Sequence, residues 1–271
     1  MRVIVLAAAC AAVCLPIRAA DDVQPSEIIR RFAAKELEFQ QARGNYTYRQ
    51  TVKLEEVEGG GKWEEVDDII FTPEGKRIEK VVYAPVQNLQ HINLTPEDAQ
   101  DLRNVQPFVL TTPESPSYDI QYLGREKVDE VGCYAFSVKP KKMLPGKRYF
   151  EGQIWVDDQD LQIVKTYGKG VGIVKGDQAF PKFETYREQI DKKYWFPTYT
   201  RANDTLHFKN GDNVPIRMTV KYQDYKKFEG RSTIKFGDVV EDPKPGTAPP
   251  AAPPLAPPLA PPLAPSATKK K

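Results

Sequence analysis

Side chains that could coordinate a metal ion are few and scattered along the chain. The two histidines, His91 and His207, lie far apart, and neither has a second histidine or a cysteine at ligand spacing. A zinc site needs three or four such ligands, so we expect no metal site. Asp157, Asp158 and Asp160 form an acidic corner, but the glycine and the distal glutamate of a calcium loop are missing. A solvated hairpin turn is the better interpretation.

Motifs for covalent or nucleotide chemistry are also missing from the sequence. There is no Gly-x-Ser-x-Gly nucleophile motif. The stretch "GKGVG" at 168–172 follows a strand-like segment and opens no helix, which indicates a flexible loop and no phosphate-binding turn. Cys133 lies in "GCYAFSV", opposite the aromatic face of that segment, and is expected to be buried and inert. We therefore predict no catalytic residue, no cofactor and no enzymatic activity.

The first twenty residues have the layout of a secretory signal peptide. Arg2 gives a positive start, an apolar run follows at residues 3–15, and two alanines precede Asp21. The run is shorter than the roughly 20 residues of a membrane span. We expect residues 1–20 to be cleaved on export to the periplasm. A lipid anchor at Cys10 or Cys14 is a minor alternative.

Charge and cysteine content constrain the remainder. The 39 basic residues fall to 37 when Arg2 and Arg18 are removed, which balances the 37 acidic residues. A neutral balance gives no electrostatic footprint for nucleic acid, so we expect no nucleic-acid partner. Cys133 is the one cysteine after residue 20 and cannot form an internal disulfide. Residues 21–240 must therefore rely on a hydrophobic core, and their length suits one β domain.

The C-terminal region, residues 241–271, differs sharply in composition. Pro-Pro-Leu-Ala occurs three times in succession from Pro253, and the chain ends in three lysines. Such a segment packs no core and favours an extended polyproline helix. We predict a disordered spacer. Alternatively it is a tether whose lysines touch an anionic envelope surface.

Two helices are predicted. In residues 25–43 apolar side chains recur at amphipathic helical spacing, and Gly44 follows as a stop signal. A second, shorter helix is expected after Thr95. Its hydroxyl can cap the helix, Pro96 suits the first helical position, and Asp98 stands three residues after the cap.

Most of the other segments alternate between apolar and polar residues with period two. This pattern indicates strands that are half buried in an antiparallel sheet. Clear examples are "NYTYRQTVKLEEV" from Asn45, "CYAFSVK" from Cys133 and "VPIRMTVKYQDY" from Val214. Further strands are predicted near 62–72, 76–84, 162–168, 182–190, 194–201 and 231–236. The total is about ten or eleven strands, mainly β with α.

A sheet of that breadth raises the question of what covers its apolar face. Ten strands at about 4.8 Å spacing extend over roughly 48 Å, whereas a helix is about 10–12 Å wide. Two helices therefore cover at most half, and the sheet must curl. It could close into a solid barrel, or stay open around an apolar hollow. Burying one CH₂ group contributes about 0.8 kcal/mol, so a hollow with few polar groups suits an acyl chain.

Three stretches resemble a known family. These are "RYFEGQIWVDDQDLQIVKTYGK" (148–169), "FETYREQIDKKYWFPTYTRA" (183–202) and "LTPEDAQDLRNVQPFVL" (94–110). They are similar to hairpins and to the lid-helix region of bacterial outer-membrane lipoprotein-sorting proteins, in the LolA/LolB-like superfamily. The resemblance implies an unclosed, strongly curved antiparallel β-barrel, covered by an N-terminal helix and a short lid helix, which binds acyl chains. Family carriers also hold their lid with an arginine, for which Arg49 and Arg77 lie on candidate strands.

The function predicted from these observations is that of a periplasmic carrier for the acyl chains of a lipoprotein or lipid, with Thr95–Leu110 as the lid. The predicted cavity lining is Tyr46, Tyr48, Val52, Tyr122, Phe136, Phe150, Ile154, Val156, Met218 and Val220. The predicted lid residues are Leu102, Phe108 and Leu110. The alternative is an envelope sensor or scaffold of the same fold, which binds a protein partner through its surface and its proline-rich tail.

Overall fold

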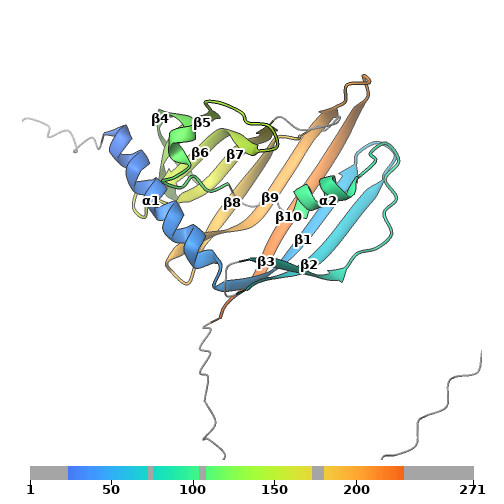
Figure 1. Cartoon of the computed structure of the whole chain (residues 1–271), viewed down its shortest axis with the longest axis horizontal. Coiled ribbons are helices and arrows are strands. Elements are labelled where there is room, and N and C mark those ends of the chain that lie inside the picture. The colour runs from blue at the N-terminus through green and yellow to red at the C-terminus, as the bar shows by residue number, and fades with distance from the viewer. Residues whose placement is uncertain (1–23, 73–75, 104–107, 173–179, 229–271) are drawn as a thin grey trace, which may run out of the picture. The chain divides into compact units, whose positions relative to one another are not determined.

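The computed structural model describes residues 24–72, 76–103, 108–172 and 180–228 (Figure 1). The predicted signal peptide, the proline-rich tail and the strand expected near 231–236 lie outside these residues. The helices are α1 (Pro25–Arg43), α2 (Pro96–Arg103) and the 3₁₀ turn η1 (Ser115–Ser117). The strands are β1 (Tyr46–Glu56), β2 (Lys62–Phe71), β3 (Arg77–Tyr83), β4 (Tyr118–Val128), β5 (Val131–Pro140), β6 (Arg148–Asp157), β7 (Ile163–Gly172), β8 (Phe183–Ile190), β9 (Tyr194–His207) and β10 (Asn213–Lys227).

All ten strands form one antiparallel sheet in the order β3-β2-β1-β10-β9-β8-β7-β6-β5-β4. The strands are joined as two meanders, one from β1 to β3 and one from β4 to β10. The meanders meet where β1 pairs with β10, with Val52 opposite Val220. The sheet is unclosed, so β3 and β4 are its two edges. This confirms the predicted fold class.

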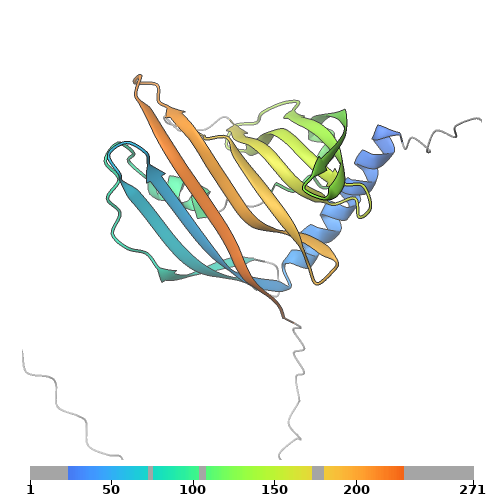
Figure 2. The ribbon, with the colours of Figure 1, turned by 180° about the vertical axis from the view of Figure 1, so that it is seen from behind.

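Both helices lie on the same face of the sheet, which we call the inner face (Figures 1 and 2). Helix α1 begins at Pro25 and ends at Arg43, directly before Gly44, as the pattern predicts. Its buried residues are Ile28, Phe32, Ala33, Glu36 and Phe39. The buried stripe thus contains a carboxylate, Glu36, which the apolar pattern did not include. In the described part of the chain, no helix is long and apolar enough to span a membrane.

The inner face carries three clusters of buried hydrophobic side chains. The first joins the N-terminal half of α1 to β4–β7 through Phe32, Phe136 and Phe150. A small aromatic cluster joins Phe39 of α1 to β1 and β9. The third covers β1, β2, β9 and β10 and is centred on Val52, Ile216, Met218 and Val220. Buried polar side chains, among them Gln50, Asp67 and Thr200, lie on the same face, so the apolar regions are separated by a polar one.

The two edge strands, β3 and β4, are consecutive in the chain. The connection between them, residues 84–117, is described at 84–103 and 108–117, and both parts pack on the inner face. Leu89, Leu94 and Leu102 contact the third cluster, whereas Leu110 is fully buried in the first. The inner face is therefore covered more fully than by the two predicted helices alone, because irregular segments of this connection also bury it.

A pair of glycines shapes the inner face at β6 and β7. Gly152 and Gly168 stand opposite each other, and the ring of Phe150 lies against both. A Cβ on Gly168 would be 2.7 Å from Phe150 Cζ and 2.3 Å from the carbonyl oxygen of Glu151. A side chain fits at neither position. Because the glycines leave this room, the Phe150 ring sits close to the sheet and stacks on Phe108, with 4.5 Å between ring centroids.

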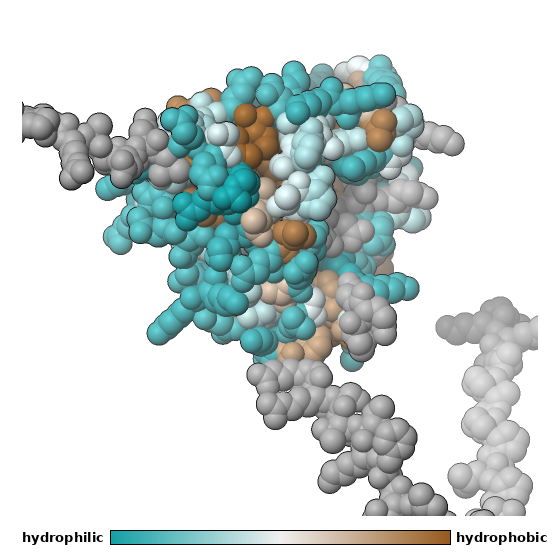
Figure 3. Space-filling view, turned by 60° about the vertical axis from the view of Figure 1, so that its left-hand side comes forward, coloured by the Kyte–Doolittle hydropathy of each residue, from teal (hydrophilic) through white to brown (hydrophobic). Residues whose placement is uncertain are grey.

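The opposite, outer face carries a smaller apolar cluster around Cys133, Ala135, Trp155 and Val164. Cys133 is buried, as predicted, and lies on the opposite face to Phe136. Burial raises the pKa of its thiol to about 11. Figure 3, in which the left-hand side of Figure 1 is brought forward, shows a mainly hydrophilic surface with small separate groups of hydrophobic residues.

Candidate ligand-binding face

The residues predicted to line a lipid cavity lie on the inner face, divided among its clusters. Phe136, Phe150, Ile154 and Val156 belong to the first cluster. Val52, Met218 and Val220 belong to the third, with Tyr48 packed against it, and Tyr46 belongs to the small aromatic cluster. Tyr122 contacts Phe136 with 5.5 Å between ring centroids, but it is 36% exposed near the β4 edge. The role of these residues as a cavity lining stays a prediction.

The three predicted lid residues are divided in the same way. Leu102 of α2 packs against the third cluster, while Phe108 and Leu110 pack with the first. Helix α2 begins as the sequence predicts. The Asp98 amide donates to Thr95 Oγ1 at 3.1 Å, and the Thr95 hydroxyl donates to Asp98 Oδ2 at 2.7 Å. This reciprocal capping holds a helix of only eight residues.

The segment before α2 is fixed by one carboxylate. Glu56, at the end of β1, has a fully buried side chain. It accepts hydrogen bonds from the backbone amides of Gln90, His91 and Ile92 at 2.7–2.8 Å. Burial raises the pKa of Glu56, but these three hydrogen bonds together lower it by more. The pKa of Glu56 therefore lies below its ordinary value. A Cβ on Gly61 would be 2.1 Å from Glu56 Oε2, so only glycine fits there.

The segment after α2 is held by an arginine that the sequence reasoning missed. Arg187 of β8 donates from Nη2 to the carbonyl oxygen of Phe108 at 2.6 Å. Its Nη1 donates to both carboxylate oxygens of Glu36 at 3.1 Å, and the amide of Ile163 donates to the same carboxylate. Burial raises the pKa of Glu36 and outweighs the opposing effect of the Arg187 charge. One buried arginine thus joins β8, α1 and the β3–β4 connection.

Arg49 and Arg77, the two arginines considered for this role, form ion pairs with carboxylates of β2 and β3. Arg49 pairs with Asp68 at 2.8 Å, and its side chain is 42% exposed. Arg77 donates to Gln50 Oε1 at 2.7 Å and pairs with Glu79. The signal that could have identified Arg187 is its register. In "FETYREQI" it alternates with Phe183 and Thr185, and it therefore stands on the buried side of its strand.

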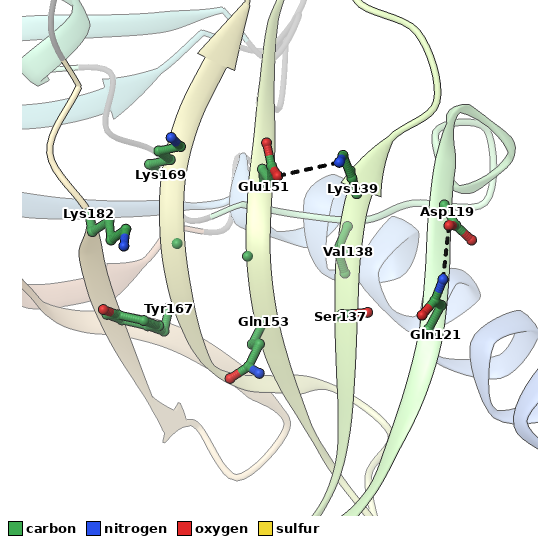
Figure 4. Close-up of a pocket in the computed structure, with 12 residues that line it drawn as sticks. Asp119, Gln121, Ser137, Val138, Lys139, Glu151, Gln153, Tyr167, Lys169 and Lys182 are labelled. Atoms are coloured by element: carbon green, nitrogen blue, oxygen red, sulfur yellow. Dashed lines mark hydrogen bonds and ion pairs between the residues drawn. The ribbon is translucent and has the colours of Figure 1, made fainter.

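A hollow of about 560 Å³ lies on the outer face, not on the inner one. In Figure 4 its polar side chains project from β4–β7 and from Lys182, directly before β8, and α1 lies behind the sheet. Lys139 and Glu151 form a loose ion pair across it, with 4.0 Å between Nζ and Oε1, and Tyr167 is 44% exposed at its border. The polar lining of this hollow does not suit an apolar ligand.

No family model matches the chain, and no curated protein matches it. Among solved structures, the chain is similar to a DUF1329 family protein from Desulfovibrio piger at 13% identity and a TM-score of 0.39, over 77% of this chain and 95% of that one. It is similar to a LolA superfamily protein from Nitrosomonas europaea at 13% identity and a TM-score of 0.33, over 75% and 93%. A lipoprotein-sorting domain from Vibrio parahaemolyticus matches at 11% identity and a TM-score of 0.33, over 74% and 94%.

Two of these structures carry the family name to which the sequence motifs point. All three identities are at or below 13%, and all three TM-scores are below 0.5.

Proposed function

We propose that this protein is a carrier, exported to the periplasm, that binds acyl chains of a lipoprotein or lipid on the inner face without a chemical step. One observation supports this most directly. Two large apolar regions on one face of an unclosed sheet are both covered by the connection between its own two edges. A cover of this kind can move aside without breaking any pairing between strands.

The packing of that connection favours exchange with a ligand. The side chains that cover the third cluster are only partly buried, whereas Val52 and Ile216 beneath them are fully buried. If an acyl chain replaced Leu89, Leu94 and Leu102, the third cluster would remain shielded from water. Its apolar contacts with the leucines would be replaced by apolar contacts with the acyl chain. Eight methylene groups contribute on the order of 6 kcal/mol before the costs of binding. The polar anchors Glu56 and Arg187 flank α2 and limit how far the connection opens.

Lipid analysis of the protein made in its own host tests this proposal. The exported protein is purified without detergent, extracted with organic solvent and analysed by mass spectrometry. We expect about one acyl lipid per chain. Protein that is free of lipid, and that takes up none when incubated with host lipid extract, contradicts the carrier function.

A second candidate function is protein binding through the β3 edge of the sheet. This edge exposes Ile78, Val81, Val82 and Tyr83, each at least 40% exposed, and an edge strand offers unpaired backbone groups to an added strand. A photo-crosslinking residue at position 82 tests this in the host. A discrete protein adduct from position 82, with none from position 169 on the outer face, supports a scaffold. Loss of that adduct without residues 243–271 assigns part of the binding to the tail.

A further inference from the structure

Three arginines lie close together at the C-terminal end of α1. Arg43 is the last residue of the helix. Arg187 contributes from β8, with its guanidinium 5.2 Å from the ring centroid of Phe39, and Arg77 begins β3. Desolvation lowers the pKa of Arg43, and the neighbouring charges of Arg187 and Arg77 lower it further. Arg43 therefore lies within electrostatic reach of two other arginines.

Two of the three guanidinium groups have their charge balanced within the chain. Arg187 is paired with Glu36, and Arg77 is paired with Glu79. Arg43 differs from both, since within the residues that the structure describes its side chain makes no hydrogen bond and no ion pair. It is half-buried all the same. The Glu36 carboxylate is within electrostatic reach of Arg43 but is hydrogen-bonded to Arg187, so the Arg43 guanidinium has no acceptor of its own there.

Two tyrosines also lie near Arg43. The Tyr48 and Tyr225 rings contact each other in a tilted arrangement with 5.2 Å between ring centroids, and both hydroxyl groups favour the charged form of Arg43. The Tyr225 hydroxyl already donates to the carbonyl oxygen of Pro197 at 2.7 Å, while that of Tyr222 bonds to Thr200. Tyr48 and Tyr222 also border the third apolar cluster. The unpaired cation therefore stands where the apolar inner face begins.

A cation removed from water without an acceptor costs free energy, and proteins normally pair such groups. A guanidinium group binds phosphate or carboxylate through two parallel hydrogen bonds. We propose that Arg43 binds the anionic head group, a phosphate or carboxylate, of an amphiphile whose acyl chain lies on the inner face. This inference rests on the proposed carrier function and adds to it the chemical class of the ligand.

Binding of two amphiphiles with equal chains tests the inference on the full chain. Dodecyl phosphate and dodecyl maltoside are titrated calorimetrically as monomers, with inorganic phosphate as a third probe. The variants are Arg43→Gln and the matched control Arg31→Gln, on the exposed side of the same helix. We expect Arg43→Gln to weaken dodecyl phosphate at least tenfold and to leave dodecyl maltoside unchanged. Arg31→Gln should bind both like the wild type.

The other outcomes separate the two claims. Equal dodecyl phosphate affinity in Arg43→Gln and wild type overturns the head-group site and leaves the carrier function standing. If neither amphiphile binds the wild type, the carrier function fails and the inference fails with it. If inorganic phosphate binds as tightly as dodecyl phosphate, the site takes free phosphate, and the assignment to an amphiphile is overturned.

Thermal stability gives a readout that distinguishes binding from a structural role. Because Arg43 lacks a partner in the described chain, Arg43→Gln without ligand should melt at or above the wild-type Tm. The variant should lose the rise in Tm that dodecyl phosphate gives the wild type. A clear fall in the Tm of the ligand-free variant would show that Arg43 supports the fold, and this would overturn the assignment.

Discussion

Arg187 and Glu36 form an ion pair at 3.1 Å in which the side chains are 1% and 0% exposed. They are separated by 151 positions in the sequence, and they join the centre of the sheet to the helix that covers it. A buried pair of this kind adds little net stability over an apolar pair, but loss of one partner leaves an uncompensated charge. Because Arg187 also holds the Phe108 carbonyl oxygen, the pair fixes α1 and the lid together.

The first prediction concerns this pair. Glu36→Gln keeps an acceptor for the Ile163 amide but leaves Arg187 buried without a counter-charge. We expect the free energy of unfolding to fall by about 3–5 kcal/mol, measured by urea denaturation. Glu27→Gln is the matched control, since Glu27 forms an exposed ion pair with Arg30 on the same helix. An effect of Glu36→Gln no larger than that of the control contradicts the prediction.

The second prediction is a pH dependence of the segment that precedes α2. The pKa of Glu56 lies below its ordinary value of 4.5. Its contribution to stability is therefore fully present above about pH 4.5 and is lost as the pH falls through the lowered pKa. Hydrogen exchange of the Gln90, His91 and Ile92 amides should accelerate in that acid range. Glu56→Gln should remove the acid-dependent part of this change, and an unaltered profile in that variant speaks against the anchor.

The third prediction concerns the glycine pair of β6 and β7. In Gly168→Ala the new methyl group meets both the Glu151 carbonyl oxygen and the Phe150 ring, so the strand and the ring must shift. We expect a loss of about 1–3 kcal/mol in the free energy of unfolding. Gly170→Ala, two residues along the same strand, has only a 3.9 Å contact to Phe180. It should leave stability within about 0.5 kcal/mol, and equal losses in the two variants would show that crowding is not the cause.

Local sequence patterns predicted most of the fold, because the spacing of apolar residues within one helix or strand shows which of its side chains are buried. Helix α1 was predicted from its apolar spacing and ends where Gly44 suggested. Strand β10 alternates with period two, and Ile216, Met218 and Val220 are buried as expected. These predictions need only the geometry of a helix or a strand. The breadth of the sheet predicted only that it curls, and the family resemblance implied that it stays open.

The contacts that organise the inner face depend on packing between distant segments, and no local pattern carries that information. In the sequence, Glu36 interrupts the apolar stripe of α1. Its burial is explained by the ion pair with Arg187, which is distant in the sequence. The unpaired state of Arg43 is visible only when its spatial neighbours are known. The contribution of irregular segments such as 89–94 to covering the inner face was not predicted either. Such segments have no periodic pattern of apolar residues that would indicate burial.

The fourth prediction concerns Cys133. Burial raises the pKa of its thiol to about 11, so thiolate is scarce near pH 8 and the side chain is inaccessible. Alkylation, followed by peptide mapping of Cys133, should be slow in the folded protein and fast in urea. Rapid labelling of the folded protein at pH 8 would show that the outer cluster opens readily.

The fifth prediction tests the inner face as the lipid site. Met218 is 2% exposed in the third cluster, directly under the side chains that would give way to an acyl chain. In Met218→Asp a carboxylate would face that chain, and its desolvation opposes binding. Thr219→Asp is the matched control, because the next residue of β10 lines a hollow on the outer face with Lys221 and Arg217. Lipid per folded chain, from mass spectrometry normalised by circular dichroism, should fall at least tenfold in Met218→Asp and stay unchanged in the control. Equal lipid retention in the two variants would place the lipid elsewhere on the protein.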